Sequence, residues 1–411
     1  MIKKIIITYL AFSCVSLFGQ DWNQIGQSIV GSTPGNKLGL SFDINIDGTV
    51  MAIGEPLNVS SGNLIGKVTV YTLEAGNWVL KGNILTSTEN EDMFGNAVSL
   101  SNDGNILAIG VKLNDEGGTN AGKVCLFQFD GSNWISYGNV LYGGHPGDVF
   151  GASVELNGAG DRLAVGIIGE DSNGESSGKV EVFQYQAGNW STLGSPMYGI
   201  TAYNGLGVSL RLSEDGNTLI ASAGYLSYDE ISKGYICVFR FDGTNWIQIS
   251  PILWGDNFGD LFGNSVAISS SGNTIIIGAP FCNSSFGVDA GAVKVLDYDG
   301  TNWNQRGPTF IGNMEGGLKG KSVSISRDGN TIAMSEPNYN NNGFMSGKVS
   351  VFQWNGANWL LKVSELNGNI AFDCAGSQIC ICGVGDNIVI GIPGDDEGGN
   401  DAGKVLVYRF N

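Results

Sequence analysis

The feature that most constrains this chain of 411 residues is an evenly spaced series of tryptophans. Seven of its nine tryptophans lie 56 or 57 residues apart, at Trp22, Trp78, Trp134, Trp190, Trp246, Trp303 and Trp359. A repeat of this length is typical of β-propellers and solenoids, in which each period is one supersecondary unit. Because seven periods fill the chain from residue 21 onward, we expect residues 21–411 to form one repetitive domain.

Each period contains the same four strand patterns, termed A to D. Strand A alternates small or polar with apolar residues, as in 265–269, while strand B is rich in β-branched residues, as in 274–277. The dipeptide Asp103-Gly104 between A and B predicts a two-residue hairpin with positive φ at both positions. The tryptophan begins strand D. The pattern predicts an all-β fold, a single seven-bladed β-propeller with four antiparallel strands per blade.

The two ends of the repeat region complement each other. The last repeat, residues 376–410, contains strands A to C, whereas residues 21–24 begin with a tryptophan strand. We expect this N-terminal strand to complete the last blade and close the ring, which leaves no open sheet edge. An open superhelix is the alternative, but it would need polar capping repeats that the sequence does not show.

Residues 1–20 have the pattern of a secretory signal peptide. Lys3 and Lys4 precede an apolar run from Ile5 to Phe18, and Gly19 follows. The run is shorter than the roughly 20 residues of a transmembrane helix. We therefore expect a secreted, periplasmic or cell-surface protein without a transmembrane segment; lipoprotein anchoring through Cys14 is the alternative.

Charge and composition exclude several classes of function. The net charge is −18, and it becomes −20 when residues 1–20, which contain two lysines and no acid, are removed. We expect no nucleic-acid partner, because affinity for a phosphate backbone rests on clustered Lys and Arg. The single histidine, His145, excludes histidine-rich metal sites and nearly excludes histidine-based triads. We expect a monomer.

Three segments of the fifth repeat carry a family resemblance: Phe262–Val266, Gly278–Pro280 and Gly291–Val293. They resemble FG-GAP repeats, the units of the integrin alpha-chain propeller, which also occur in surface and secreted bacterial proteins. The resemblance implies a non-catalytic scaffold for binding or cell adhesion. Family members that bind calcium carry several acids between strands A and B, whereas the segment 102–104 offers one carboxylate in a short turn.

The long loops are the expected binding surface. In such blades the B–C and D–A connections emerge on one face, termed the loop face, and the A–B and C–D turns on the opposite turn face. Crowded carboxylates on the loop face could recruit Ca²⁺ or a basic partner; simple solvation is the alternative. The predicted ligand-binding residues are Asp115, Glu116, Glu170, Asp171, Asp395, Asp396, Glu397 and Asp401.

Aromatic and cysteine residues give weaker signals. Six aromatic residues on or near the loop face could stack on sugars: Tyr142, Tyr225, Tyr228, Trp254, Phe258 and Tyr339. The seven spaced tryptophans are expected to pack rather than to bind. A single disulfide from Cys374 to either Cys380 or Cys382 is compatible with their positions in the last repeat.

The leading hypothesis is a secreted or surface propeller that binds a protein or glycan through its acidic loop face, without catalysis. A carbohydrate-active enzyme, such as a glycosidase or lyase, is the alternative, and it would need two acids that break the repeat. Strand A, which should line the channel, is rich in Ser, Ala and Val, so we assign no catalytic residue. A third alternative is a purely structural module of a surface complex.

Overall fold

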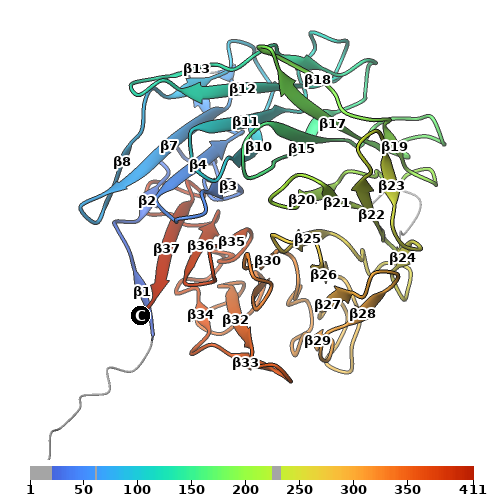
Figure 1. Ribbon diagram of the computed structural model, residues 1–411. Helices are drawn as coiled ribbons and strands as arrows, with labels where there is room; N and C mark the ends of the chain where they lie inside the picture. The colour runs from blue at the N-terminus through green and yellow to red at the C-terminus, as the bar shows by residue number, and fades with distance from the viewer. Residues whose placement is uncertain (1–20, 61–62, 225–232) are drawn as a thin grey trace, which may run out of the picture.

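Seven sheets stand around a central channel in the computed structural model, which describes residues 21–60, 63–224 and 233–411 (Figure 1). The inner strands A are β3 (Ser41–Ile44), β10 (Phe94–Leu100), β15 (Phe150–Leu156), β20 (Ser209–Leu212), β25 (Ser265–Ile268), β30 (Val323–Ile325) and β35 (Ile379–Cys382). Strands B are β4 (Val50–Glu55), β11 (Ile106–Val111), β16 (Arg162–Ile167), β21 (Thr218–Ala223), β26 (Thr274–Ala279), β31 (Thr331–Glu336) and β36 (Asn387–Ile392). The described residues form strands and no helix, as predicted.

The outer half of each blade contains a long strand C and a divided strand D. Strands C are β7 (Lys67–Glu74), β12 (Lys123–Phe129), β17 (Lys179–Gln186), β22 (Tyr235–Phe241), β27 (Ala292–Tyr298), β32 (Lys348–Trp354) and β37 (Lys404–Phe410). The tryptophan pieces of strand D are β8 (Asn77–Leu80), β13 (Trp134–Ser136), β18 (Asn189–Thr192), β23 (Trp246–Gln248), β28 (Trp303–Gln305), β33 (Trp359–Leu361) and β1 (Trp22–Gln24). The second pieces are β9 (Leu85–Thr86), β14 (Leu141–Tyr142), β19 (Met197–Tyr198), β24 (Leu253–Trp254), β29 (Phe310–Ile311), β34 (Leu366–Asn367) and β2 (Ile29–Val30). A small hairpin, β5 (Val59–Ser60) and β6 (Asn63–Leu64), lies in the first B–C loop.

The predicted closure of the ring is confirmed. Blade one contains β3, β4, β7, β8 and β9, and blades two to six follow in chain order. Blade seven combines β35, β36 and β37 with β1 and β2 from the other end of the chain. Strand β1 pairs antiparallel with β37, with Trp22 opposite Phe410, and β3 contacts β35. The chain is therefore a closed propeller and not an open superhelix.

The prediction of a two-residue A–B hairpin is wrong in its geometry. Gly104 has positive φ (65°), but Asp103 does not. The backbone N–H of Gly104 donates to the carbonyl of Ser101 at 2.9 Å, and the connection spans residues 102–105. The Asp103 carboxylate accepts hydrogen bonds from the Ser101 hydroxyl (2.6 Å) and the Asn105 N–H (3.0 Å). Aspartate is therefore used here as a side-chain acceptor that shapes the turn.

The hydrophobic core lies between adjacent blades. Every residue of strand B is buried in five blades, as expected for a strand covered on both faces. Between blades two and three, for example, Ile106 and Val124 pack with Val154, Leu163 and Trp190. Because each blade shares its core with both neighbours, the ring is a rigid support for its loops.

The spaced tryptophans link neighbouring blades, in agreement with their expected packing role. Five of the seven donate an indole N–H to a backbone carbonyl of the preceding blade, as Trp134 does to Lys81 at 2.8 Å. Trp303 is an exception, because the hydroxyl of Tyr298 donates to the equivalent carbonyl, that of Ile249, at 3.1 Å. The buried indole N–H of Trp303 has no hydrogen-bond partner among the described residues.

The six described cysteines are unpaired, including Cys374, Cys380 and Cys382. The disulfide considered from the sequence does not form in this structure. The predicted signal peptide, with Cys14, lies outside the described residues and stays a prediction.

Candidate functional site

Three of the predicted loop acids shape their own loops. Asp115, Asp171 and Asp396 occupy equivalent positions in B–C loops, and each accepts a hydrogen bond from the backbone N–H five residues later, at 2.7, 2.7 and 2.8 Å. The donor residue in each loop has positive φ, as Asp401 does (52°). These side chains stabilise a left-handed backbone conformation that a non-glycine residue rarely adopts. Their recurrence along the sequence therefore has a structural cause.

Two further predicted acids on neighbouring blades have local partners. Glu116 forms an ion pair with Lys123 at 2.6 Å, although its side chain is 47% exposed. The side-chain hydrogen bond from Lys123 is the main cause of a lowered pKa for Glu116. Glu170 is buried and accepts hydrogen bonds from both the backbone N–H and the hydroxyl of Ser172.

The densest acidic segment, residues 395–401, is organised by a lysine. Lys404 contacts Asp395 at 2.7 Å and Glu397 at 2.6 Å. Asp395 is buried, whereas Glu397 is 61% exposed. The neighbouring Asp373 has a pKa raised to about 6, first by burial and then by the charge of Asp395. Asp401 faces Lys37 at 4.0 Å.

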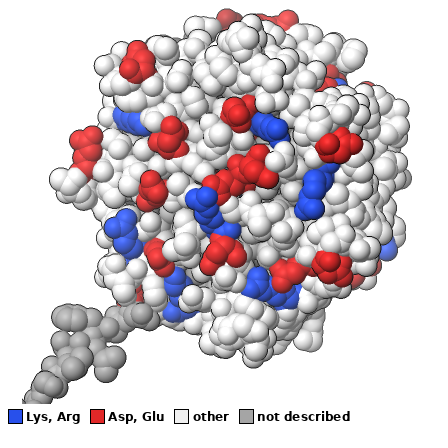
Figure 2. Space-filling model, viewed as in Figure 1, with Lys and Arg blue, Asp and Glu red and all other residues white. Residues whose placement is uncertain are grey.

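The structure does not gather the predicted acids into one site. They lie in the B–C loops of blades two, three and seven, and blade one separates blade seven from blade two. Figure 2 shows the turn face, opposite the predicted acids, where acidic and basic side chains are interspersed. Within residues 21–60, 63–224 and 233–411, no group of three or more His, Cys, Asp or Glu side chains could hold a metal ion.

Exposed aromatic side chains are concentrated on the loop face. Those that are at least 43% exposed all lie in or beside B–C or D–A connections: Tyr142, Tyr198, Trp254, Phe258, Phe286, Phe344 and Phe372. The most exposed is Phe258, at 74%, and Phe344 contacts Phe372 with ring centroids 5.5 Å apart. Of the aromatics named from the sequence, Tyr339 is half-buried beneath the ammonium of Lys348. Tyr225 and Tyr228 lie outside the described residues.

A second candidate site, missed from the sequence, lies in the central channel. One strand A position per blade lines a cavity of about 310 Å³. Its seven residues are Asp43, Ser99, Glu155, Arg211, Ala267, Ser324 and Cys380. The expectation of a channel lined mainly by Ser, Ala and Val is therefore wrong at this position, where three blades contribute charged side chains.

Most polar side chains at this position connect neighbouring blades. Asp43 accepts a hydrogen bond from the backbone N–H of Leu100 in the next blade, at 2.7 Å. Ser99 and Ser324 make the same blade-to-blade contact, at 3.0 and 2.9 Å. The second carboxylate oxygen of Asp43 accepts the N–H of Ile44 at 2.9 Å. Asp43 is therefore held on both oxygens by the backbone.

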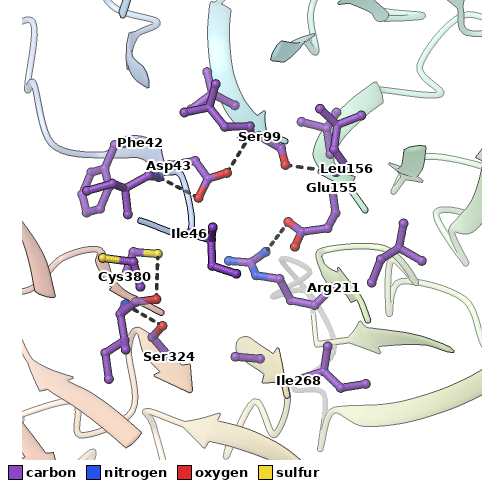
Figure 3. A pocket seen from close by; sticks show the side chains of 18 of the residues that line it. Phe42, Asp43, Ile46, Ser99, Glu155, Leu156, Arg211, Ile268, Ser324 and Cys380 are labelled. Carbon is purple, nitrogen blue, oxygen red and sulfur yellow. Dashed lines mark hydrogen bonds and ion pairs between the residues drawn. The ribbon is translucent and has the colours of Figure 1, made fainter. Parts of the chain in front are cut away.

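Glu155 differs from these residues because it faces a charged side chain instead of a backbone N–H. Its carboxylate lies 3.7 Å from the guanidinium of Arg211, which donates a hydrogen bond to the carbonyl of Leu210 at 2.8 Å. Figure 3 shows Glu155 and Arg211, which come from adjacent blades, directed toward each other in the channel. The separation exceeds hydrogen-bond length, so the ion pair is loose.

Burial dominates the electrostatics of the channel. It raises the pKa of Glu155 to about 8, against the opposing effect of Arg211, and the charge of Asp43 adds to the increase. Burial also raises the pKa of Asp43 to about 6, while the N–H groups of Leu100 and Ile44 oppose the change. The side chains of Glu155 and Arg211 are 20% and 39% exposed, and this exposed surface faces the channel.

The channel meets the surface on the turn face. Asn102, Gly158, Glu214, Ser270 and Arg327 line both the cavity and an open depression outside it. Their backbones form a chain of hydrogen bonds from blade to blade, at 2.9–3.2 Å. The carboxylate of Glu214 accepts a hydrogen bond from Asn102 at 3.2 Å and also contacts Ser270 and Arg327. Glu214 therefore ties four blades together at this mouth.

The chain matches no model of a known protein family and no curated protein sequence. Solved structures that resemble it include the β-propeller domain of Cps50 (Swd1) from Myceliophteria thermophila, with a TM-score of 0.58 and 13% sequence identity. This match covers 94% of this chain and 100% of that chain. U3-55K is similar, with a TM-score of 0.57 and 10% identity over 95% of this chain and 98% of that chain. Identities this low support the propeller fold alone. Within the described ranges, no helix is long and apolar enough to span a membrane.

Proposed function

We propose that this chain is an exported, non-catalytic binding propeller that recognises a protein or glycan at the cell surface through its loop face. Its repeats would then be divergent FG-GAP units, which the motif at Phe262–Val266 supports. The proposed location, secreted, periplasmic or on the cell surface, rests on the signal-peptide pattern of residues 1–20.

One observation carries this proposal: the exposed aromatic side chains are confined to the face with the long connections. Exposed aromatic rings on one face are typical of surfaces that bind proteins or stack on sugars. The contact between Phe344 and Phe372, which are 58% and 61% exposed, forms an apolar projection between blades six and seven. Exposed acids in the same set of loops, such as Glu397, would steer a basic partner.

The test is a glycan-array and pull-down screen with the wild type and the double variant Phe344→Ala/Phe372→Ala. Removing both rings should weaken capture of the partner about tenfold or more, because exposed aromatic anchors dominate such interfaces. The matched control is Leu360→Ala, which removes a 52% exposed apolar side chain from strand D. If both variants capture the same partners as the wild type, the loop-face assignment is wrong.

The alternative of a carbohydrate-active enzyme is tested separately by glycosidase and lyase assays. Asp43 and Glu155 have differently raised pKa values, which is a property of paired catalytic carboxyl groups. However, both oxygens of Asp43 are already engaged by backbone N–H groups. Hydrolysis or elimination that Glu155→Gln abolishes would overturn the non-catalytic proposal.

A further inference from the structure

We propose that the central channel binds a small solute that carries a protonated amine, with the ammonium group beside Glu155. This site is distinct from the loop face and does not depend on the function proposed for that face. It would accept a molecule of the size of an amino sugar or an amino-acid derivative.

The charges on the ring of strand A residues support a cationic group. Asp43, Glu155 and Arg211 are its three charged members, and they come from blades one, three and four. Ser99, Ala267 and Ser324 carry no charge, and burial raises the pKa of Cys380 so far that its thiol stays neutral. With both carboxyl groups ionised, the ring has one negative charge in excess, which disfavours an anionic ligand.

In the empty channel, the proton on Glu155 supplies the positive charge that a bound ammonium group would supply. Because the pKa of Glu155 is about 8 and that of Asp43 about 6, the empty ring is electrically balanced near pH 7 with Glu155 protonated. When an ammonium group binds, Glu155 can lose its proton, so the net charge of the ring and its ligand stays zero. The 3.7 Å separation from Arg211 leaves the carboxylate oxygens of Glu155 available as acceptors.

The size of the cavity limits the rest of the ligand. About 310 Å³ lies at the lower end of the range for small-molecule sites, so the channel suits a compact solute and not a chain. Ser99 and Ser324 add hydroxyl groups to the lining, which suit a polar molecule. The mouth around Glu214 and Arg327 joins the cavity to the turn face, so a solute would enter past these two side chains.

Two matched pairs of probes test the amine directly, because each pair exchanges an ammonium group for a hydroxyl group. The pairs are D-glucosamine with D-glucose, and L-alaninamide with L-lactamide. We expect at least one amine to bind about tenfold or more tightly than its hydroxyl partner in calorimetry at pH 7. Titration in buffers of different ionisation enthalpy should show about one proton released per bound amine. The pair in which the amine binds more tightly than its hydroxyl partner shows whether the ligand is an amino sugar or an amino-acid derivative.

Two variants test the position of the site. Glu155→Gln should bind the amine about tenfold less tightly and abolish proton release. Ala267→Ser, which places at this ring position the residue found in two other blades, should bind as the wild type does; tryptophan fluorescence verifies that both variants fold. Equal affinity for amine and hydroxyl probes, no binding of either amine, or full affinity in Glu155→Gln would each overturn the proposal.

Discussion

Glu155→Gln should make the stability of the protein less dependent on pH. In the folded chain the pKa of Glu155 is raised to about 8, whereas a carboxyl group of this type ionises near 4.5 when exposed in the unfolded chain. Between these pH values the folded chain keeps a proton that the unfolded chain releases, so rising pH favours unfolding. The stabilisation from protonated Glu155 is complete below about pH 4.5 and is lost as the pH rises toward 8. Glutamine cannot ionise, so the variant lacks this loss.

The magnitude follows from the size of the pKa change. At about 1.36 kcal/mol per pKa unit, the full change would correspond to about 4.8 kcal/mol. The side chain is 20% exposed to the channel, so screening by solvent reduces this value. From pH 5 to pH 8.5, the free energy of unfolding of the wild type should fall by about 2–3 kcal/mol more than that of Glu155→Gln.

Urea unfolding followed by tryptophan fluorescence measures this difference, because the seven spaced indoles are buried in the folded ring. The control is Glu89→Gln, the same substitution at an exposed D–A loop position, and its stability should follow that of the wild type at every pH. If the wild type and Glu155→Gln lose stability in parallel from pH 5 to pH 8.5, Glu155 ionises normally in the channel and the reasoning about burial is wrong.

Two other predictions concern contacts between strands and between blades. The Glu336 carboxylate lies 2.7 Å from Lys319 and 2.9 Å from Lys348, and both lysines are buried. Glu336→Ala should lower the free energy of unfolding by about 3–5 kcal/mol, because it leaves both lysines without their shared carboxylate. A loss below about 1 kcal/mol in urea unfolding would contradict the role of this ion triad. Trp134→Phe should cost about 1 kcal/mol more than Trp303→Phe, because the indole of Trp134 donates a blade-to-blade hydrogen bond and that of Trp303 does not. Equal losses in thermal melts of the two variants would show that the indole hydrogen bond adds nothing to blade packing.

The architecture was readable from the sequence because it depends on spacing. The interval between tryptophans predicted seven blades, and the position of Trp22 predicted which blade the N-terminal strand completes. The division of strand D into two pieces was not predicted. The second piece is only two residues long and follows a glycine with positive φ, such as Gly138 (79°), so it leaves little periodic pattern.

The candidate sites were predicted less well, for two physical reasons. Asp115, Asp171 and Asp396 recur because a left-handed residue five positions later needs a side-chain acceptor, and the sequence alone does not separate such a role from ligand binding. The channel residues had a usable signal. Glu155 and Arg211 stand at the repeat position where three other blades have serine or alanine, so alignment of the repeats by tryptophan would have revealed them. Their proximity depends on the packing of the adjacent blades three and four, which composition does not describe.

The pairing of β1 with β37 also has a consequence for the order in which the protein is made. Strand β1 is synthesised before the other strands of the ring, and it stays without its partner until β37 has been synthesised. Six blades can assemble during that time, while the edge of the seventh stays open. In a chain that ends before β37, β1 stays unpaired and the ring stays open. The exposed strand edges then favour aggregation and degradation. Completion of the ring therefore requires both β1 and β37, which meet at the junction of Trp22 and Phe410.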